Sequence, residues 1–148
     1  MTEDTARRCV LIPCSNTETW AVPQICLAEI LMLPAAMNKP PGQVTWRDRI
    51  VPILDMGEDD GSVWCKSSRA SGLVAIFLGL EGEACKYWGV AVRGDSLAAA
   101  KILPEDVEDA PEAKLQHAAA AFHLKGVLYQ VPDLDSLQKR IAVEQRVA

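Results

Sequence analysis

The segment from Val44 to Asp55 contains the feature of this sequence that most restricts its fold. Between Ile50 and Leu54, four of the five residues are Ile, Val or Leu, and the run is too short for an independent helix. Pro52 lies inside the run. A proline has no amide donor for a β-ladder, and it disfavours a helical conformation in the residue before it. The segment is therefore expected to be an edge strand or a bulged strand in a mainly β fold.

The face pattern of this strand points to protein docking. If the strand is regular, alternation places Trp46, Ile50 and Leu54 on one face, and on the other Arg47, Arg49, Val51 and Ile53. The second face would combine two guanidinium groups with two exposed or half-exposed aliphatic side chains. Arginine is favoured in protein interfaces, so this composition indicates a docking surface. The alternative is that both arginines are simply solvated.

The sequence around this strand resembles the central signature of CheW-like chemotaxis adaptor domains. In that signature a glycine is followed by Asn-Leu-Arg-Gly and then by Val-Pro-Val-Ile-Asp-Leu. The matching residues here are Gly42, Arg47 and the run from Ile50 to Asp55, while Trp46 replaces the usual Leu and Asp48 the usual Gly.

The flanking segments follow the order of the same family, from about Arg8 to Arg140. They are an opening hairpin that ends at Val22-Pro23, the segment Leu27-x-Glu29-Ile30, the strand Trp88 to Val92, the pair Gly126-Val127, and the segment from Val131 to Leu137. The family has an aspartate directly after the strand that ends at Val92, whereas this chain has Arg93, so any interaction made by that acid is in doubt.

The resemblance implies a mainly β fold of two small interlocked SH3-like five-stranded β-barrels with a short C-terminal helix. Residues 1–7 are expected to form a flexible N-terminal tail, and residues 8–148 a single CheW-like domain made of two β-barrel subdomains. A chain of 148 residues is the size of one domain and can bury a real core.

The resemblance also implies a non-catalytic adaptor that couples the cytoplasmic tip of a methyl-accepting chemoreceptor to the regulatory domain of a CheA-type histidine kinase. Carried over by position, the receptor- or kinase-facing residues would be Leu27, Glu29, Gly42 and Arg47, and the strand pattern adds Arg49, Val51 and Ile53. Glu29 is a lone charge among apolar neighbours, and Arg47 is its candidate partner. A solvated Glu29 is the alternative.

The substitutions at Trp46 and Asp48 resemble the divergent adaptors of type IV pilus chemosensory systems, of the ChpC type, more than the flagellar adaptor. The pathway would then be twitching motility. The changes at Asp48 and Arg93 also leave open a degenerate adaptor that binds only one of the two partners.

Charge and patterning exclude several other classes. The net charge is -5 and the basic residues are dispersed, so nucleic-acid binding is not expected. No apolar run approaches the ~18 residues of a membrane span, and no signal-peptide pattern follows the charged N-terminus. A cytoplasmic location without membrane insertion is therefore expected. Five cysteines without a CxxC pair indicate reduced thiols, most of them buried as small apolar side chains.

No motif of a familiar catalytic, cofactor or metal site is present in the sequence, so neither an enzyme nor a cofactor is expected. His117 and His123 have no partner at metal-ligand spacing and no evident carboxylate, so surface or packing roles are expected. The acidic segment from Gly57 to Ser62 lacks EF-hand spacing and is expected to be a solvated turn. The competing hypothesis is a small β-barrel ligand-binding protein or enzyme whose pocket leaves no sequence motif.

Local propensity and the resemblance conflict at two segments. Leu27 to Leu33 and Ser96 to Leu103 both read as helix on propensity alone, while the family places a strand at each, and we follow the family. Ala113 to Ala121 is alanine-rich and predicts a short helix. Asp135-x-x-Gln138 has the pattern of a capping box at the start of a terminal helix, with Leu137 and Ile141 on one face.

Overall fold

The computed structural model describes residues 7–34, 39–57, 64–66, 71–79, 87–93 and 97–147. Within these residues the chain forms short strands, three 3-10 turns and one helix. The strands are β1 (Arg7–Pro13), β2 (Thr19–Pro23), β3 (Leu27–Pro34), β4 (Gln43–Trp46), β5 (Arg49–Leu54), β6 (Cys65–Lys66), β7 (Ser71–Leu78), β8 (Tyr87–Ala91), β9 (Ala98–Ile102), β10 (Val107–Asp109), β11 (Ala118–Leu124) and β12 (Val127–Pro132). The 3-10 turns are η1 (Gln24–Cys26), η2 (Pro104–Asp106) and η3 (Pro111–Ala113), and the helix is α1 (Leu134–Val147).

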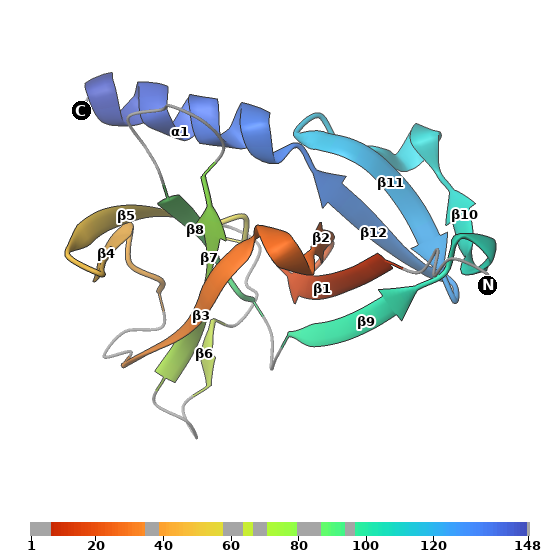
Figure 1. Cartoon of the computed structure of the whole chain (residues 1–148), viewed down its shortest axis with the longest axis horizontal. Coiled ribbons are helices and arrows are strands. Elements are labelled where there is room, and N and C mark those ends of the chain that lie inside the picture. The colour runs from red at the N-terminus through yellow and green to blue at the C-terminus, as the bar shows by residue number, and fades with distance from the viewer. Residues whose placement is uncertain are drawn as a thin grey trace, which may run out of the picture.

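The strands form two curled sheets (Figure 1). Sheet A has the order β10-β11-β12-β2-β1-β9, and sheet B has the order β3-β7-β8-β5-β4 with β6 paired to β7. The mainly β fold with a C-terminal helix is confirmed. Each sheet has six described strands where the resemblance implied five. The short strands β10 and β6, of three and two residues, account for the difference.

The chain passes from one sheet to the other and back, which interlocks the two units. Strands β1 and β2 belong to sheet A, β3 to β8 to sheet B, and β9 to β12 to sheet A again. Strand β2 pairs in parallel with β12, and β5 pairs in parallel with β8. Helix α1 leaves sheet A after β12 and runs over sheet B (Figure 1). Both sheets therefore depend on segments that are distant in the sequence.

Alternation along the strands produces three separate cores. The inter-sheet core contains Ile12, Trp20 and Val22 of sheet A, Phe77, Trp88 and Val90 of sheet B, and Leu137 and Ile141 of α1. The sheet-B core contains Trp46, Val51, Ile53, Trp64, Val74 and Ile76. The sheet-A core contains Ala21, Ile102 and Phe122, with Cys9, Leu11, Ala100 and Val131 packed against them. Each barrel thus has its own interior, and a third apolar layer joins the barrels to each other and to α1.

Three cysteines that lie among the described residues, Cys9, Cys14 and Cys26, are free thiols. Cys14 is buried, as predicted for most of the cysteines, while Cys9 and Cys26 are half-buried. Burial, with Glu18 nearby, raises the pKa of the Cys14 thiol well above its ordinary value. Cys14 therefore packs as a small neutral side chain at physiological pH.

Pairing between strands determines the structure of the segments at which helix propensity and the family resemblance disagree. The segment Leu27 to Leu33 lies in β3, which pairs with β7, and the segment Ser96 to Leu103 contains β9, which pairs with β1. Both strand predictions are confirmed. The helix predicted for Ala113 to Ala121 is wrong, because its second half belongs to β11, which is paired on both sides. Interstrand hydrogen bonds there outweigh the helix propensity of alanine, which is only a few tenths of a kcal/mol per residue.

The terminal helix is capped two residues earlier than predicted. The Asp133 carboxylate accepts hydrogen bonds from the Ser136 amide at 3.2 Å and from the Ser136 hydroxyl at 3.0 Å, so Asp133 is the N-cap. The predicted capping box of Asp135 and Gln138 is wrong, because Asp135 already lies inside the helix and Gln138 is buried. Leu137 and Ile141 share the buried face, as predicted.

Two predictions concern residues that the structure leaves mostly undescribed. In the predicted tail of residues 1–7, only Arg7 is described, and it begins β1. In the acidic turn predicted from Gly57 to Ser62, only Gly57 is described; the rest lies outside the described residues.

Candidate partner-binding surface

The segment Val44 to Asp55 is a hairpin and not one strand. Strands β4 and β5 pair antiparallel with Trp46 opposite Arg49, so Arg47 and Asp48 form a two-residue turn. Both turn residues have left-handed backbones, with φ of 50° at Arg47 and 63° at Asp48. Such a turn needs positive φ at both central positions, because its twist must match that of the strands. The regular alternation assumed across the whole segment is therefore wrong. The expected edge or bulged strand is wrong as well, because β5 pairs with both β4 and β8 and neither pairing shows a register shift.

The reversal at the turn changes which side chains share a face. Trp46, Val51 and Ile53 are all buried in the sheet-B core, while Ile50 is 64% exposed. Val51 and Ile53 were expected beside the arginines on an exposed face, and their burial corrects that expectation. The tight turn restarts the alternation, so the core face of β5 carries Val51 and Ile53 and not Ile50.

Both arginines of the hairpin lie over aromatic rings. The guanidinium carbon of Arg47 is 4.4 Å from the ring centroid of Trp46, and that of Arg49 is 5.5 Å from the centroid of Tyr87. The two rings contact each other edge-on, with centroids 4.9 Å apart. An exposed cation–π contact contributes about 0.5–1 kcal/mol. The buried Trp46 ring and the half-buried Tyr87 ring thus restrict the positions of the two solvent-facing guanidinium groups.

Glu29 on β3 pairs with Arg47, as predicted. Arg47 Nη2 lies 3.5 Å from Glu29 Oε1, and the two side chains are 67% and 42% exposed. Strands β3 and β4 are opposite ends of sheet B, so this ion pair joins the two ends of the curled sheet. A pair this exposed is worth at most about 1 kcal/mol, after screening by solvent. Loss of this ion pair on binding a partner would therefore lower the stability of the fold only slightly.

The hairpin–edge surface is the name used here for seven exposed residues of β3 and the β4–β5 hairpin. Its members are Glu29, Ile30, Met32, Arg47, Asp48, Arg49 and Ile50. Met32 is 71% exposed, and β3 pairs with β7 alone among the described strands. An open strand edge with exposed aliphatic groups and charges can bind a partner strand or surface.

Leu27 and Gly42, the other two residues predicted to face a partner, differ in their exposure. Leu27 is half-buried against the inter-sheet core, so only part of it can reach a partner. Gly42 is exposed, and a Cβ atom built there would meet nothing within 4 Å. Its carbonyl accepts a hydrogen bond from the Ile53 amide at 2.9 Å. The fold therefore needs the Gly42 backbone but not the absence of a side chain.

Replacing Asp48 by Gly is expected to stabilise the protein by about 0.5–1 kcal/mol, because glycine adopts positive φ without the steric cost that a Cβ atom brings. Urea unfolding followed by circular dichroism measures the difference. The same substitution at Asp109, which lies within β10, is the control and should destabilise. A loss of stability in Asp48→Gly would show that the aspartate side chain supports the turn.

The sequence did not reveal an ion pair at the junction of the two sheets. Arg93 Nε donates to Asp55 Oδ1 at 3.0 Å, and Arg93 Nη2 donates to Asp55 Oδ2 at 2.5 Å. The side chains are only 6% and 18% exposed. The Arg93 amide also donates to the Pro13 carbonyl at the end of β1, at 2.7 Å. The one signal in the sequence is that Arg93 stands where the family has an acid, and this does not indicate which carboxylate the arginine meets.

A second polar cluster lies beside the inter-sheet core. One carboxylate oxygen of Glu18, Oε2, accepts from Trp20 Nε1 at 2.5 Å and lies 2.5 Å from His117 Nε2. His117 thus has a carboxylate partner, contrary to the expectation, although its predicted packing role holds. Ninety-nine positions separate the two residues in the sequence, so no local spacing could have indicated the pair.

The described residues contain no group of three or more His, Cys, Asp or Glu side chains that could hold a metal ion. No helix among them is long and apolar enough to cross a membrane. The fold and the surface together define a two-barrel β-protein that presents an open strand edge and paired surface charges.

Comparison with known proteins agrees with this class. No protein-family model matches the sequence, and no curated protein sequence matches it. Among solved structures, the chain is similar to the scaffolding protein TtCheW from Thermoanaerobacter tengcongensis, with a TM-score of 0.58 and 12% identity. The alignment covers 91% of this chain and 89% of that chain. The protein therefore has a CheW-like fold, which confirms the resemblance at the level of the fold.

Proposed function

We propose that this protein is a non-catalytic chemosensory adaptor that binds the regulatory domain of a CheA-type histidine kinase and the cytoplasmic tip of a methyl-accepting chemoreceptor. It would act in the cytoplasm, in a chemotaxis or twitching-motility pathway. The observation that carries the proposal is the exposed Glu29–Arg47 pair at the open edge of sheet B. The CheW-like fold, shared with a protein described as a scaffold, supports it.

The proposed contact residues are Leu27, Glu29, Gly42, Arg47 and Arg49. The buried Val51 and Ile53 are left out, because a side chain inside the sheet-B core cannot reach a partner. Exposed charges at such a rim set the association rate and the choice of partner more than the total affinity. The adjacent Ile50 and Met32 supply the apolar area that a docking surface also needs.

The burial of Arg93 is relevant to the alternative of a degenerate adaptor that binds only one of the two partners. Its side chain is almost fully enclosed and paired with Asp55, so this substitution alters the junction of the sheets and not the exposed surface. Asp48 remains the substitution that changes the hairpin–edge surface itself. We therefore infer that Arg93 leaves the proposed contact residues unchanged, so that only Asp48 bears on the alternative in which a single partner is bound.

Arg47→Glu is expected to weaken capture by a kinase regulatory domain or a receptor tip by about fivefold or more, which corresponds to about 1 kcal/mol of rim electrostatics. The measurement is a pull-down, quantified by titration, with the full chain and each partner purified separately. Circular dichroism first establishes that the variant is folded.

Lys125→Glu is the matched control for this experiment. Lys125 is an exposed cation in the turn between β11 and β12, and its φ of 52° matches that of Arg47. The control carries the same charge reversal in the same backbone conformation, but on sheet A. Equal capture by wild type and Arg47→Glu, or equal weakening by both variants, would remove Arg47 from the proposed interface.

The exchange variant Glu29→Arg/Arg47→Glu separates the partner contact from support of the fold. It rebuilds the ion pair in the opposite order, so stability should return to near the wild-type value, while capture stays weak. If this variant recovered capture, the Glu29–Arg47 pair would support only the closure of the sheet-B barrel and would make no contact with the partner.

A further inference from the structure

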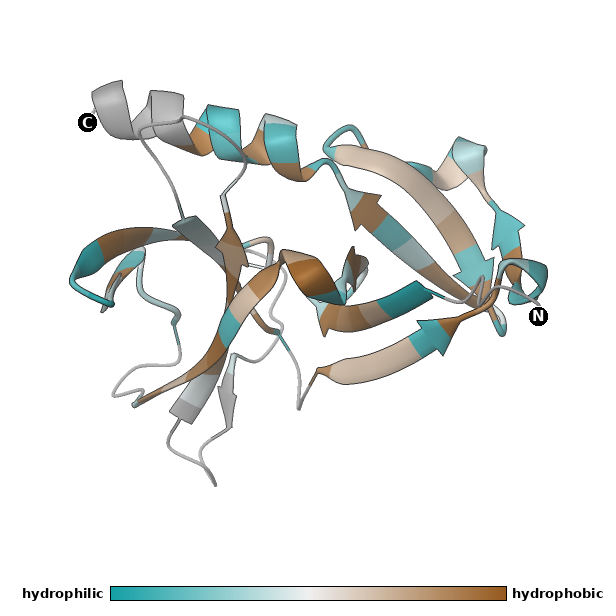
Figure 2. Cartoon of the chain, viewed as in Figure 1, coloured by the Kyte–Doolittle hydropathy of each residue, from teal (hydrophilic) through white to brown (hydrophobic). Residues whose placement is uncertain are grey.

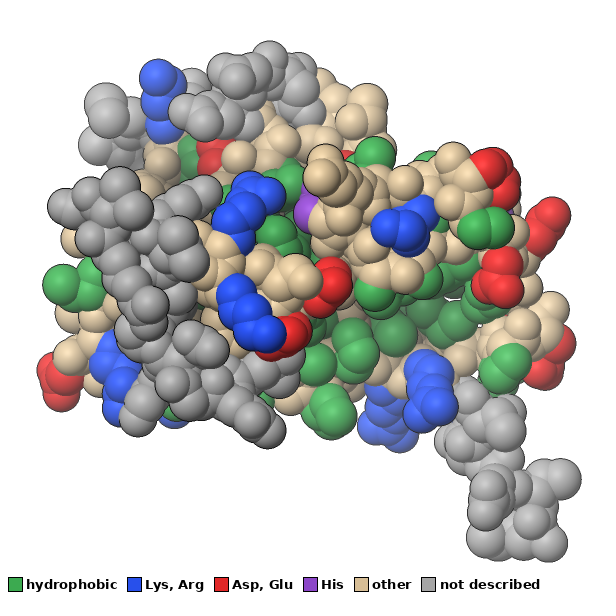
Figure 3. Space-filling model, turned by 90° about the horizontal axis from the view of Figure 1, so that it is seen from above, with side chains coloured by type: hydrophobic (Ala, Val, Ile, Leu, Met, Phe, Trp, Pro, Cys, Tyr) green, Lys and Arg blue, Asp and Glu red, His purple; other side chains and the backbone are tan. Residues whose placement is uncertain are grey.

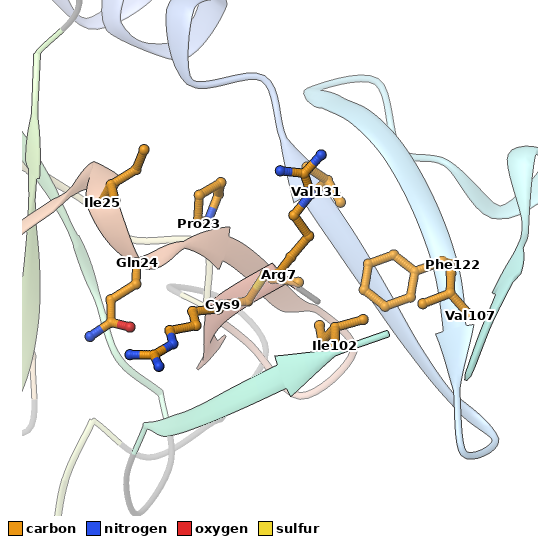
Figure 4. Close-up of a pocket in the computed structure, with 11 residues that line it drawn as sticks. Arg7, Cys9, Pro23, Gln24, Ile25, Ile102, Val107, Phe122 and Val131 are labelled. Carbon is orange, nitrogen blue, oxygen red and sulfur yellow. The ribbon is translucent and has the colours of Figure 1, made fainter. Parts of the chain in front are cut away.

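The interior of the sheet-A barrel contains a pocket of about 910 Å³. Its wall includes Cys9, Ala21, Ile102, Phe122 and Val131, all residues of the sheet-A core or packed against it. Figure 4 shows Ile102, Phe122 and Val131 meeting around it from β9, β11 and β12. The pocket thus lies inside one barrel, whereas the hairpin–edge surface belongs to the other.

Small side chains leave this space unfilled. A small barrel is normally filled by the side chains that point inward from its strands. The sheet-A core consists of Ala21, Ile102 and Phe122 and contains no tryptophan, whereas the sheet-B core contains two, Trp46 and Trp64. In Figure 2 the alanine-rich strands β9 and β11 are accordingly paler than β5. The volume falls within the range of about 300–1,000 Å³ that small-molecule pockets occupy.

The opening of the pocket is cationic. Arg7 and Arg8 line it, and both are exposed. Neither has a carboxylate within salt-bridge distance among the described residues, and no described Asp or Glu lines the pocket. Figure 3 shows a hydrophobic hollow over this part of the molecule with Lys or Arg side chains at its margin.

An exposed aliphatic side chain adds to the apolar wall at the same opening. Ile25 in η1 lines the pocket and is 85% exposed, the largest exposed fraction among the described large hydrophobic residues. An exposed apolar side chain beside an apolar pocket adds to the area that an apolar ligand can bury. The pocket therefore has an apolar wall, an apolar lip and a positive rim, which together fit a molecule with an apolar chain and one anionic end.

We propose that the sheet-A barrel binds a single-chain fatty-acid carboxylate, with the acyl chain in the pocket and the carboxylate at Arg7, which shares a face of β1 with Cys9. Arginine is suited to this role because its guanidinium group can donate two parallel hydrogen bonds to a carboxylate. The inference goes beyond the adaptor function and does not depend on it, since the pocket and the hairpin–edge surface lie on different sheets.

Calorimetric titration of the full chain with dodecanoate, below the concentration at which it forms micelles, tests the proposal. Saturable binding at one site is expected. Arg7→Gln/Arg8→Gln should weaken it by about fivefold or more, the effect of losing about 1 kcal/mol of charge pairing. Arg47→Gln/Arg49→Gln removes the same charge from sheet B and should leave binding unchanged. Dodecanol, which has the chain without the charge, should bind about as weakly as dodecanoate binds to the first variant.

Cys9 supplies a second measurement that locates the ligand. Burial raises the pKa of the Cys9 thiol, against the opposing effect of Arg7, so alkylation by iodoacetamide is followed at alkaline pH. Dodecanoate should slow alkylation at Cys9, mapped by mass spectrometry, and leave that at Cys26 unchanged. Ala21→Leu should narrow the pocket and weaken both dodecanoate binding and the protection of Cys9. If this variant fails to fold, the protection of Cys9 in the wild-type protein still tests the proposal.

Three results would overturn the proposal. They are the absence of saturable dodecanoate binding, equal losses in the two double-arginine variants, and binding that leaves the Cys9 alkylation rate unchanged.

Discussion

Replacing Arg93 by Met is expected to lower the free energy of unfolding by about 3–5 kcal/mol, because it leaves the Asp55 carboxylate without its buried partner. Two hydrogen bonds join the side chains, at 3.0 and 2.5 Å, and both groups are largely enclosed. Asp55 also accepts from the Gly57 amide at 3.2 Å, so it holds the end of β5 in place. Urea unfolding at pH 7 gives the difference.

Two further variants distinguish the ion pair from the packing of the arginine stem. Arg93→Met/Asp55→Leu removes both charges and should recover much of the loss, since an apolar pair of similar size avoids the desolvation cost. Arg49→Met removes an exposed cation and its contact with Tyr87, and should change stability by no more than about 1 kcal/mol. A loss below 1 kcal/mol in Arg93→Met would show that the carboxylate is well solvated without the arginine.

Trp20→Ala is expected to cost about 3–5 kcal/mol, the usual cost of removing a large buried aromatic side chain. Trp20 is fully buried in the inter-sheet core, with ring centroids 6.3 Å from Phe77 and 6.4 Å from Trp88 on sheet B. It also donates to the buried Glu18 carboxylate. The substitution therefore removes contacts between the two sheets as well as a hydrogen bond within sheet A.

Trp20→Phe separates the two contributions. It keeps an aromatic ring in the inter-sheet core but removes the indole donor to Glu18, so a smaller loss of about 1–3 kcal/mol is expected. Unfolding of both variants, followed by circular dichroism and by NMR, should stay a single transition, because the shared core couples the sheets. Two separate transitions in Trp20→Ala would show that the barrels fold independently.

The hairpin at Arg47–Asp48 shows where prediction of the site failed. The paired arginines and their link to Glu29 could be predicted from residue types and from the family signature. The tight turn could not, because neither Arg nor Asp is the glycine that usually signals left-handed backbone. That single missed turn placed Val51 and Ile53 on the surface instead of in the core.

The polar pairs inside the protein were beyond prediction for a different reason. Glu18 and His117 belong to segments that meet only because β12 adds in parallel to β2 and brings the β11–β12 hairpin into sheet A. Asp55 and Arg93 meet because the ends of β5 and β8 lie side by side in sheet B. Such contacts follow from the order of strands in the sheets, which residue spacing does not encode.

What the sequence by itself determined is the strand content, the CheW-like signature and the charged residues of the proposed surface, since these depend on local composition and on the order of motifs. Only the tertiary structure decided which side chains are buried, that Ala118–Leu124 is a strand, and that the sheet-A barrel has a pocket open to the surface. The physical reason is that burial and pairing depend on how two sheets curl and pack across distant segments, and those long-range contacts outweigh the small local preferences of each residue.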